Sequence, residues 1–178
     1  MTEPSASPAP PADAEPRWLD RREQGAWMRL SAVLELLPAA LDAQLRRDSR
    51  LTYVEYYSLA MLSEHPGRRM QTKDLAASAN ATLPRLSRVL NGLVAAGYVE
   101  RRPNEADARA TDILLTGAGM AALEAAAPAH VRMVRSTVLD PISSDDVDTL
   151  IRIADAWLDG LDPDRRLSRD PDELPGRD

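Results

Sequence analysis

The fold of this chain is decided by residues 72–116, which read TKDLAASANATLPRLSRVLNGLVAAGYVERRPNEADARATDILLT. The clearest signal is a set of apolar side chains spaced to line one face of an α-helix, namely Leu83, Leu86, Leu90, Leu93 and Val94. Thr82 can cap this helix, Pro84 suits its first turn, and Gly97 is typical of a helix end. We therefore predict an amphipathic helix between Thr82 and Gly97.

The opposite face of the predicted helix is narrow and basic. It carries Pro84, Arg85, Ser87, Arg88, Asn91, Gly92 and Ala95. Upstream, Thr72 can cap a short helix, and Asn80 and Ala81 form a brief turn. Downstream, Tyr98–Pro103 and Thr111–Leu115 read as strands joined by a charged loop. This order predicts a winged helix-turn-helix, which places its second helix in a DNA major groove. We therefore predict a sequence-specific DNA-binding transcription regulator.

Charge is unevenly distributed along the chain. The whole sequence has a net charge of -6, which argues against an indiscriminate binder of nucleic acid. Residues 68–109, however, hold eight cations and four anions, a balance of +4, so the remainder carries -10. Such segregation favours one docking orientation on DNA.

The flanking segments read as long helices with more apolar surface than one domain easily buries. One stripe runs from Trp27 to Leu45, and the last runs from Val147 to Leu161. We expect a homodimer joined through these helices, although packing within one chain is an alternative. The predicted fold is mainly α with a small β wing: a winged helix over about 52–116, with dimerisation helices over about 17–47 and 116–161.

Residues from about Trp18 to Leu161 resemble the MarR (multiple antibiotic resistance regulator) family of homodimeric bacterial winged-helix repressors. The resemblance rests on residues 75–76 (LA), 86–90 (LSRVL), 93–103 (LVAAGYVERRP), 107–109 (DAR) and 114–116 (LLT). It implies that Asp107 orders the wing and that Arg109 reaches the minor groove or its phosphates. Many members place a carboxylate and then Arg where this chain has Asn91-Gly92. This difference removes one cation and adds a residue that weakens helices by roughly 1 kcal/mol relative to Ala.

The predicted DNA contacts divide by role. Arg88 and Asn91 are expected to read base edges, and Arg109 to enter the minor groove. Phosphate contacts are expected from Lys73, Thr82, Arg85 and Ser87. The full predicted set is Thr72, Lys73, Thr82, Pro84, Arg85, Ser87, Arg88, Asn91, Arg102, Asp107 and Arg109. The expected partner is double-stranded DNA with a pseudo-palindromic operator.

The resemblance also implies a cleft for a small aromatic or anionic effector between the dimer helices and the winged lobe. By segment position, the candidate lining residues are Trp27, Tyr53, Tyr56, Tyr57, Met61, His65 and Arg69. The alternative is that the aromatic residues are ordinary core side chains with a polar tip. We expect effector binding to weaken DNA binding.

The sequence shows no motif for metal binding, cofactor binding or catalysis. The chain has no Cys and only His65 and His130 as imidazoles, so we expect no metal, cofactor or catalytic site. A winged helix that binds a protein instead of DNA is the alternative function. Residues 1–16 and 162–178 are rich in Pro or in alternating Asp and Arg, and we expect both to be disordered tails. Without a secretion signal or membrane span, we expect a cytoplasmic protein.

Overall fold

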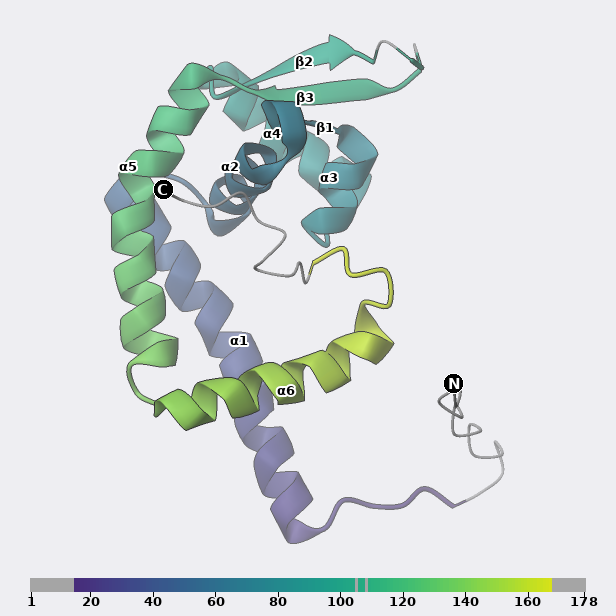
Figure 1. Cartoon of the computed structure of the whole chain (residues 1–178), viewed down its shortest axis with the longest axis vertical. Helices are drawn as coiled ribbons and strands as arrows, with labels where there is room; N and C mark the ends of the chain where they lie inside the picture. The colour runs from purple at the N-terminus through teal and green to yellow at the C-terminus, as the bar shows by residue number, and fades with distance from the viewer. Residues whose placement is uncertain (1–14, 105, 108, 168–178) are drawn as a thin grey trace. The chain divides into compact units, whose positions relative to one another are not determined.

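The part of the chain that the structure describes is mainly helical and carries one small sheet (Figure 1). The computed structural model describes residues 15–104, 106–107 and 109–167. It contains two compact units, the first ending at Leu37 and the second beginning at Pro38. Helix α1 (Arg21–Ser49) begins in the first unit and ends in the second.

In the first unit, the start of α1 is fixed by Asp20. Its carboxylate accepts hydrogen bonds from the backbone N–H groups of Arg22 and Glu23, at 2.7 and 2.8 Å. These bonds satisfy amides that have no partner within the helix. Beyond this cap, the unit leaves several large apolar side chains exposed: Trp18, Leu19, Trp27, Met28, Val33, Leu34 and Leu36.

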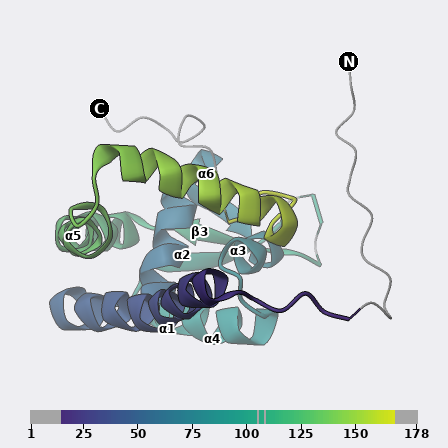
Figure 2. The ribbon, with the colours of Figure 1, turned by 90° about the horizontal axis from the view of Figure 1, so that it is seen from below.

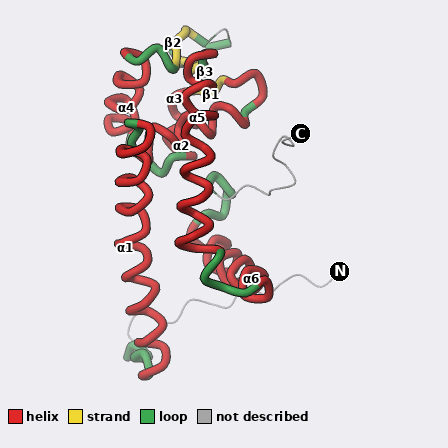
Figure 3. The backbone as a smooth tube through the Cα atoms, turned by 90° about the vertical axis from the view of Figure 1, so that its left-hand side faces the viewer, coloured by secondary structure: helices red, strands yellow, loops and turns green. Residues whose placement is uncertain are grey.

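The second unit contains the winged helix and the C-terminal helices. Its elements are α2 (Tyr53–Glu64), a 3-10 turn (Pro66–Arg68), β1 (Arg69–Gln71), α3 (Thr72–Ser78), α4 (Leu83–Ala95), β2 (Val99–Pro103), β3 (Thr111–Leu115), α5 (Gly117–Val134), a π-helical turn (Arg135–Leu139) and α6 (Ser144–Leu161). The predicted fold class is confirmed, because strands occupy only one small part of the described chain (Figure 3).

Local hydrogen bonds mark the helix ends. Thr52 and Glu55 form a capping box at α2, and Ser143 and Asp146 form another at α6. The hydrogen bonds from Ser143 lower the pKa of the Asp146 carboxyl below its ordinary value. Helix α4 ends in a Schellman motif, in which Tyr98 N–H donates to Leu93 O and Gly97 has a φ of 74°.

The sheet has the order β1–β3–β2 and is antiparallel. Strands β2 and β3 form the predicted wing, with Arg101 opposite Ile113. Strand β1 was not predicted, because three residues are too few to show an alternating pattern. It is held by its pairing with β3, where Met70 lies opposite Ile113 and both side chains are buried.

The hydrophobic core lies between α2, α3, α4 and the sheet, and the end of α1 and helix α5 add Leu45, Leu123 and Ala126 to it. Helix α4 lies at the edge of this lobe (Figure 2). Leu86, Leu90 and Leu93 face the core as predicted. The prediction was wrong for Leu83 and Val94, whose side chains are 54% and 40% exposed. These residues lie in the terminal turns of α4, which extend beyond the core.

The ends of the chain lie mostly outside the described residues. The described start of the predicted C-terminal tail forms a turn in which Asp162 is buried and accepts hydrogen bonds from the N–H groups of Arg166 and Leu167. The rest of this predicted tail, residues 168–178, and most of the N-terminal one, residues 1–14, are outside the described part.

Candidate nucleic-acid interface

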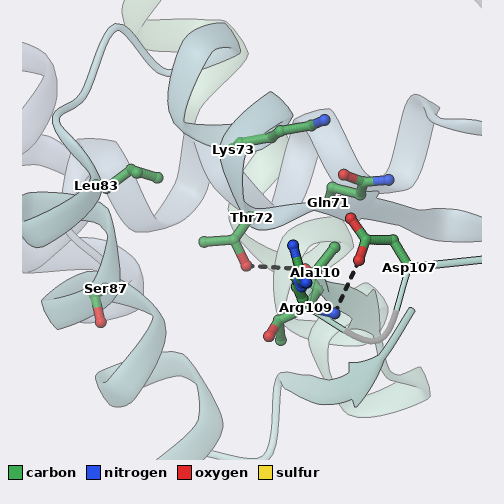
Figure 4. Close-up of a pocket in the computed structure, with 9 residues that line it drawn as sticks. Gln71, Thr72, Lys73, Leu83, Ser87, Asp107, Arg109 and Ala110 are labelled. Atoms are coloured by element: carbon green, nitrogen blue, oxygen red, sulfur yellow. Dashed lines mark hydrogen bonds between the residues drawn. The ribbon is translucent and has the colours of Figure 1, made fainter.

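A hollow of about 470 Å³ lies between the start of α3, the first turns of α4 and the end of the wing (Figure 4). We call it the α3–wing hollow. It is lined by Gln71, Thr72, Lys73, Leu83, Ser87, Asp107, Arg109, Ala110 and Thr111. Five of the predicted DNA-binding residues therefore meet on one concave surface, although they come from three separate segments of the sequence.

Thr72 connects two walls of the hollow. Its hydroxyl donates a hydrogen bond of 3.0 Å to the backbone carbonyl of Thr111 in β3 (Figure 4). The prediction that Thr72 caps the short helix was wrong, because Gln71 is the N-cap of α3 and Thr72 is already helical. The strand β1, which the sequence did not reveal, moves the start of the helix and turns the Thr72 hydroxyl toward the sheet.

The other predicted contact residues of α4 lie on its exposed face. Arg85, Arg88 and Asn91 are exposed, whereas Leu86 and Leu90 face the core. Thr82 is the N-cap as predicted and Pro84 lies in the first turn. The Thr82 side chain makes no capping hydrogen bond, so its hydroxyl is not engaged with the helix end. Helix α4 thus presents a narrow polar face with two arginines.

Gly92 has a packing role that the sequence did not reveal. A β-carbon at this position would lie 3.3 Å from Oε1 of Glu55, closer than side chains normally approach. Glu55 is held in place, because its other carboxylate oxygen accepts a 2.7 Å hydrogen bond from the Thr52 N–H in the capping box of α2. Glycine therefore lets α4 pack closely against the start of α2.

The wing tip is shaped by an asparagine and a buried carboxylate. Asn104 Oδ1 accepts hydrogen bonds from the N–H groups of Ala106 and Asp107, at 3.0 and 2.9 Å. Its side-chain amide donates to the buried carboxylate of Asp112, at 2.9 Å. Sequence reasoning missed both residues as determinants of the site, although Asn is a common turn former.

Asp107 contacts the backbone beside Arg109. Its Oδ1 accepts a hydrogen bond of 2.9 Å from the Arg109 N–H. The predicted role of Asp107 in ordering the wing stays a prediction. Both side chains are exposed at the α3–wing hollow, as Figure 4 shows.

The two arginines of β2 have different partners. Arg101 donates a hydrogen bond of 3.3 Å to the backbone carbonyl of Ser87 and so links β2 to α4. Arg102 forms an exposed ion pair of 2.7 Å with Glu100 on its own strand. Arg102 is a predicted DNA contact, but it does not line the α3–wing hollow.

Comparison with known proteins matches this fold to one family. The model of the MarR family matches residues 51–110. The crystal structure of Sco3205, a MarR family transcriptional regulator from Streptomyces coelicolor in complex with DNA, is 36% identical with a TM-score of 0.80. That match covers 85% of this chain and 94% of Sco3205. The chain belongs to the MarR family.

The chain is also similar to two further proteins. AbsC, a MarR family transcriptional regulator from Streptomyces coelicolor, is 32% identical with a TM-score of 0.77, over 82% of this chain and 98% of AbsC. The transcriptional repressor YetL from Bacillus subtilis is 30% identical over 95 residues, which are 53% of this chain. That match spans only 56% of YetL.

Membership in the MarR family confirms the main functional prediction. The chain is a DNA-binding transcription regulator, and the alternative of a protein-interaction module is not favoured. Among the described residues, no group of three or more His, Cys, Asp or Glu side chains could hold a metal ion. Among the helices that the structure describes, none combines the length and the apolar composition of a membrane-spanning segment.

The structure brings together only part of the effector set suggested by the MarR resemblance. Tyr53 and Tyr57 lie on α2 with ring centroids 6.1 Å apart, and the ring of Tyr56 lies 4.5 Å from that of His130 on α5. His65 and Arg69 follow the opposite end of α2, and Met61 is half-buried near that end. Trp27 is exposed and belongs to the first unit.

His130 was not predicted as part of the effector set. Its Nδ1 lies 3.3 Å from Oε1 of Gln44, a buried side chain of α1, and burial lowers the pKa of the imidazole. Burial also raises the pKa of the Tyr53 phenol. Both shifts favour the uncharged form of these side chains at neutral pH. Tyr56 is buried in the hydrophobic core and Tyr53 packs against that core, as the alternative of ordinary core side chains expects. The spacing between His130 and the tyrosines in sequence gave no signal of this contact.

Proposed function

We propose that this chain is a homodimeric transcription repressor that binds a pseudo-palindromic operator in double-stranded DNA. The observation that carries this proposal is the α3–wing hollow, where Lys73, Arg109 and the Thr72 and Ser87 side chains share one concave surface. Cations and hydroxyls are the groups that proteins use to hold DNA phosphates. The repressor part is supported by the similarity to YetL, which is named a transcriptional repressor.

The roles of individual residues follow from their positions. Arg88 and Asn91 lie on the exposed face of α4 and would read base edges in the major groove. Lys73, Thr82, Arg85 and Ser87 would contact phosphates at the rim of that groove. Arg109 would reach the minor groove or its phosphates from the wing, with Asp107 holding the backbone beside it.

The homodimer is supported by apolar side chains that remain exposed in one copy of the chain. On α6, these are Leu150, Ile151, Trp157 and Leu161. A second copy that covers them would remove this surface from water. A two-fold dimer would also place two α4 helices in successive major grooves, about 34 to 36 Å apart. This geometry requires an operator with two related half-sites. We also propose that the protein is cytoplasmic, because a regulator that binds a chromosomal operator must share the compartment of the chromosome.

We also propose that a small aromatic or anionic effector weakens DNA binding. The group formed by Tyr53, Tyr56, Tyr57 and His130 supports the aromatic part. The effector would act by favouring a dimer geometry that does not fit the operator. A thermal-shift screen with phenols and aromatic carboxylates, followed by DNA release assays, tests this proposal. A compound that stabilises the protein without changing its affinity for DNA would contradict the allosteric part.

The proposed function is tested by fluorescence anisotropy with purified protein. The DNA upstream of its own gene, DNA fragments selected from the whole genome and a scrambled duplex are titrated across a salt series. We expect sequence-selective, salt-dependent binding that Arg88→Ala and Arg109→Ala both weaken. The loss at Arg88 is expected to be roughly 1 to 3 kcal/mol at one operator position.

Arg152→Ala is the matched control for these variants. It removes the same charge from an exposed position on α6, outside the basic segment 68–109. We expect this variant to bind like the wild type. Equal binding of wild type to selected and scrambled DNA would contradict the proposed function.

A further inference from the structure

Leu83 is an aliphatic side chain in an otherwise polar part of the predicted DNA surface. It is the first residue of α4, and its side chain is 54% exposed although its spacing places it in the apolar stripe. Figure 4 shows Leu83 and Ser87 together on one side of the α3–wing hollow, with Thr72 between them and Arg109. An apolar group therefore lies among the cations and hydroxyls that are proposed to hold the DNA backbone.

Exposure by itself does not indicate a function, because single exposed leucines are common on protein surfaces. The place of Leu83 at the start of α4 is a stronger indication of a function than its exposure. In helix-turn-helix proteins, the first residues of the recognition helix contact base edges. Ser87 lies one turn further along the same face of α4, and both residues line the hollow. Ser87 is proposed to contact a phosphate, so the shared face does not by itself bring Leu83 to the bases. Its place in the first turn of α4, the end of the helix that would enter the major groove, puts it within reach of a base edge.

The major groove offers one apolar group, the C5 methyl of thymine. Every other position on the base edges there is a hydrogen-bond donor, an acceptor or a C–H. We propose that Leu83 reads a thymine methyl in each half-site of the operator. The inference rests on the proposed function and adds a specificity residue to it. The contact removes the methyl and the leucine from water, and it would favour thymine over cytosine at one position.

The test replaces thymine by deoxyuridine, which removes only the methyl group. In an operator fragment selected from genomic DNA, each thymine is exchanged singly, and the affinity is measured by fluorescence anisotropy. We expect one exchange per half-site to weaken wild-type binding about fourfold, the effect of exposing one buried methyl. For Leu83→Ala, the affinities for the thymine-containing and the deoxyuridine-containing DNA should become nearly equal at that position.

Val94→Ala is the matched control. Val94 is also an exposed aliphatic residue of α4, but it lies in the last turn and does not line the hollow. This variant should keep the wild-type preference for thymine. A second variant, Leu83→Gln, introduces a group that pairs with adenine and should also lose the preference for the methyl. Circular dichroism of both Leu83 variants should match the wild type, because the side chain is outside the core.

The outcomes separate this inference from the proposed function. If the wild type binds its selected fragment tightly but tolerates deoxyuridine at every position, the role of Leu83 is wrong and the proposed function stands. The role is also wrong if Leu83→Ala keeps the wild-type discrimination. If no genomic fragment binds better than a scrambled duplex, the proposed function fails and the role of Leu83 fails with it.

Discussion

At the scale of single residues, Gly119 shows how one missing side chain fixes the position of an element. A β-carbon at Gly119 would overlap the backbone carbonyl of Tyr98 and lie 2.8 Å from Cδ1 of Leu115. The Tyr98 carbonyl is not free to move, because it accepts a 3.1 Å hydrogen bond from the N–H of Thr116. Glycine is therefore required where α5 meets the wing.

We predict that Gly119→Ala lowers the free energy of unfolding by about 1 to 3 kcal/mol, because the added methyl overpacks a rigid contact. Gly117→Ala is the matched control on the same helix, since nothing lies within 4 Å of a β-carbon there. That variant should be neutral or slightly stabilising. Urea denaturation measures both, and equal stabilities of the two variants would disprove the packing argument.

At the scale of elements, the wing and the recognition helix are connected by Arg101. Its hydrogen bond to the Ser87 carbonyl fixes β2 against α4, so Arg101 is a positioning residue for α4. We predict that Arg101→Ala weakens operator binding about fivefold, equivalent to about 1 kcal/mol for the lost bond. The salt dependence of binding should stay unchanged, because no phosphate contact is lost.

Arg102→Ala provides the comparison for this prediction. Arg102 is one residue away and carries the same charge, but its partner is the exposed Glu100. Arg102 belongs to the predicted set of DNA contacts, and if it binds a phosphate, its loss should reduce the slope of log affinity against log salt by about 0.9. If Arg101→Ala reduced this salt slope by a similar amount, Arg101 would bind DNA directly instead of positioning α4.

The elements also differ in how far the sequence predicted them. Helix α4 was predicted because Leu86, Leu90 and Leu93 repeat with helical spacing and Thr82 and Pro84 mark its start. Strand β1 was missed because it has three residues and depends on pairing with β3. The Asn104–Asp112 bond was missed for the same physical reason, since only the hairpin brings the two residues together.

At the scale of the whole molecule, the exposed apolar face of α6 sets the expected assembly. Trp157 is 46% exposed on this face. We predict that Trp157→Glu yields a monomer in light scattering after size exclusion, because a charge cannot be buried without a partner. Affinity for a two-site operator should fall roughly 100-fold, since the two half-sites would no longer be bound as a unit.

Thr149→Glu is the control for this prediction. Thr149 is exposed on α6, about 130° around the helix from the centre of its apolar stripe by the 3.6-residue period. The substitution adds the same charge and should leave a dimer that binds DNA normally. A Trp157→Glu variant that stays dimeric would place the subunit interface elsewhere.

The sequence by itself determined the order of the helices and of the two wing strands, the basic segment and the exposed face of α4. These features depend on residue spacing, capping and composition, which act over a few neighbouring residues. The tertiary structure decided that Leu83 is exposed, that Thr72 bonds to the sheet, that Gly92 packs beside Glu55, and that His130 joins the tyrosines of α2. The burial of a side chain and the pairing of strands depend on which distant segments meet. The spacing of residues along the chain does not reveal those contacts.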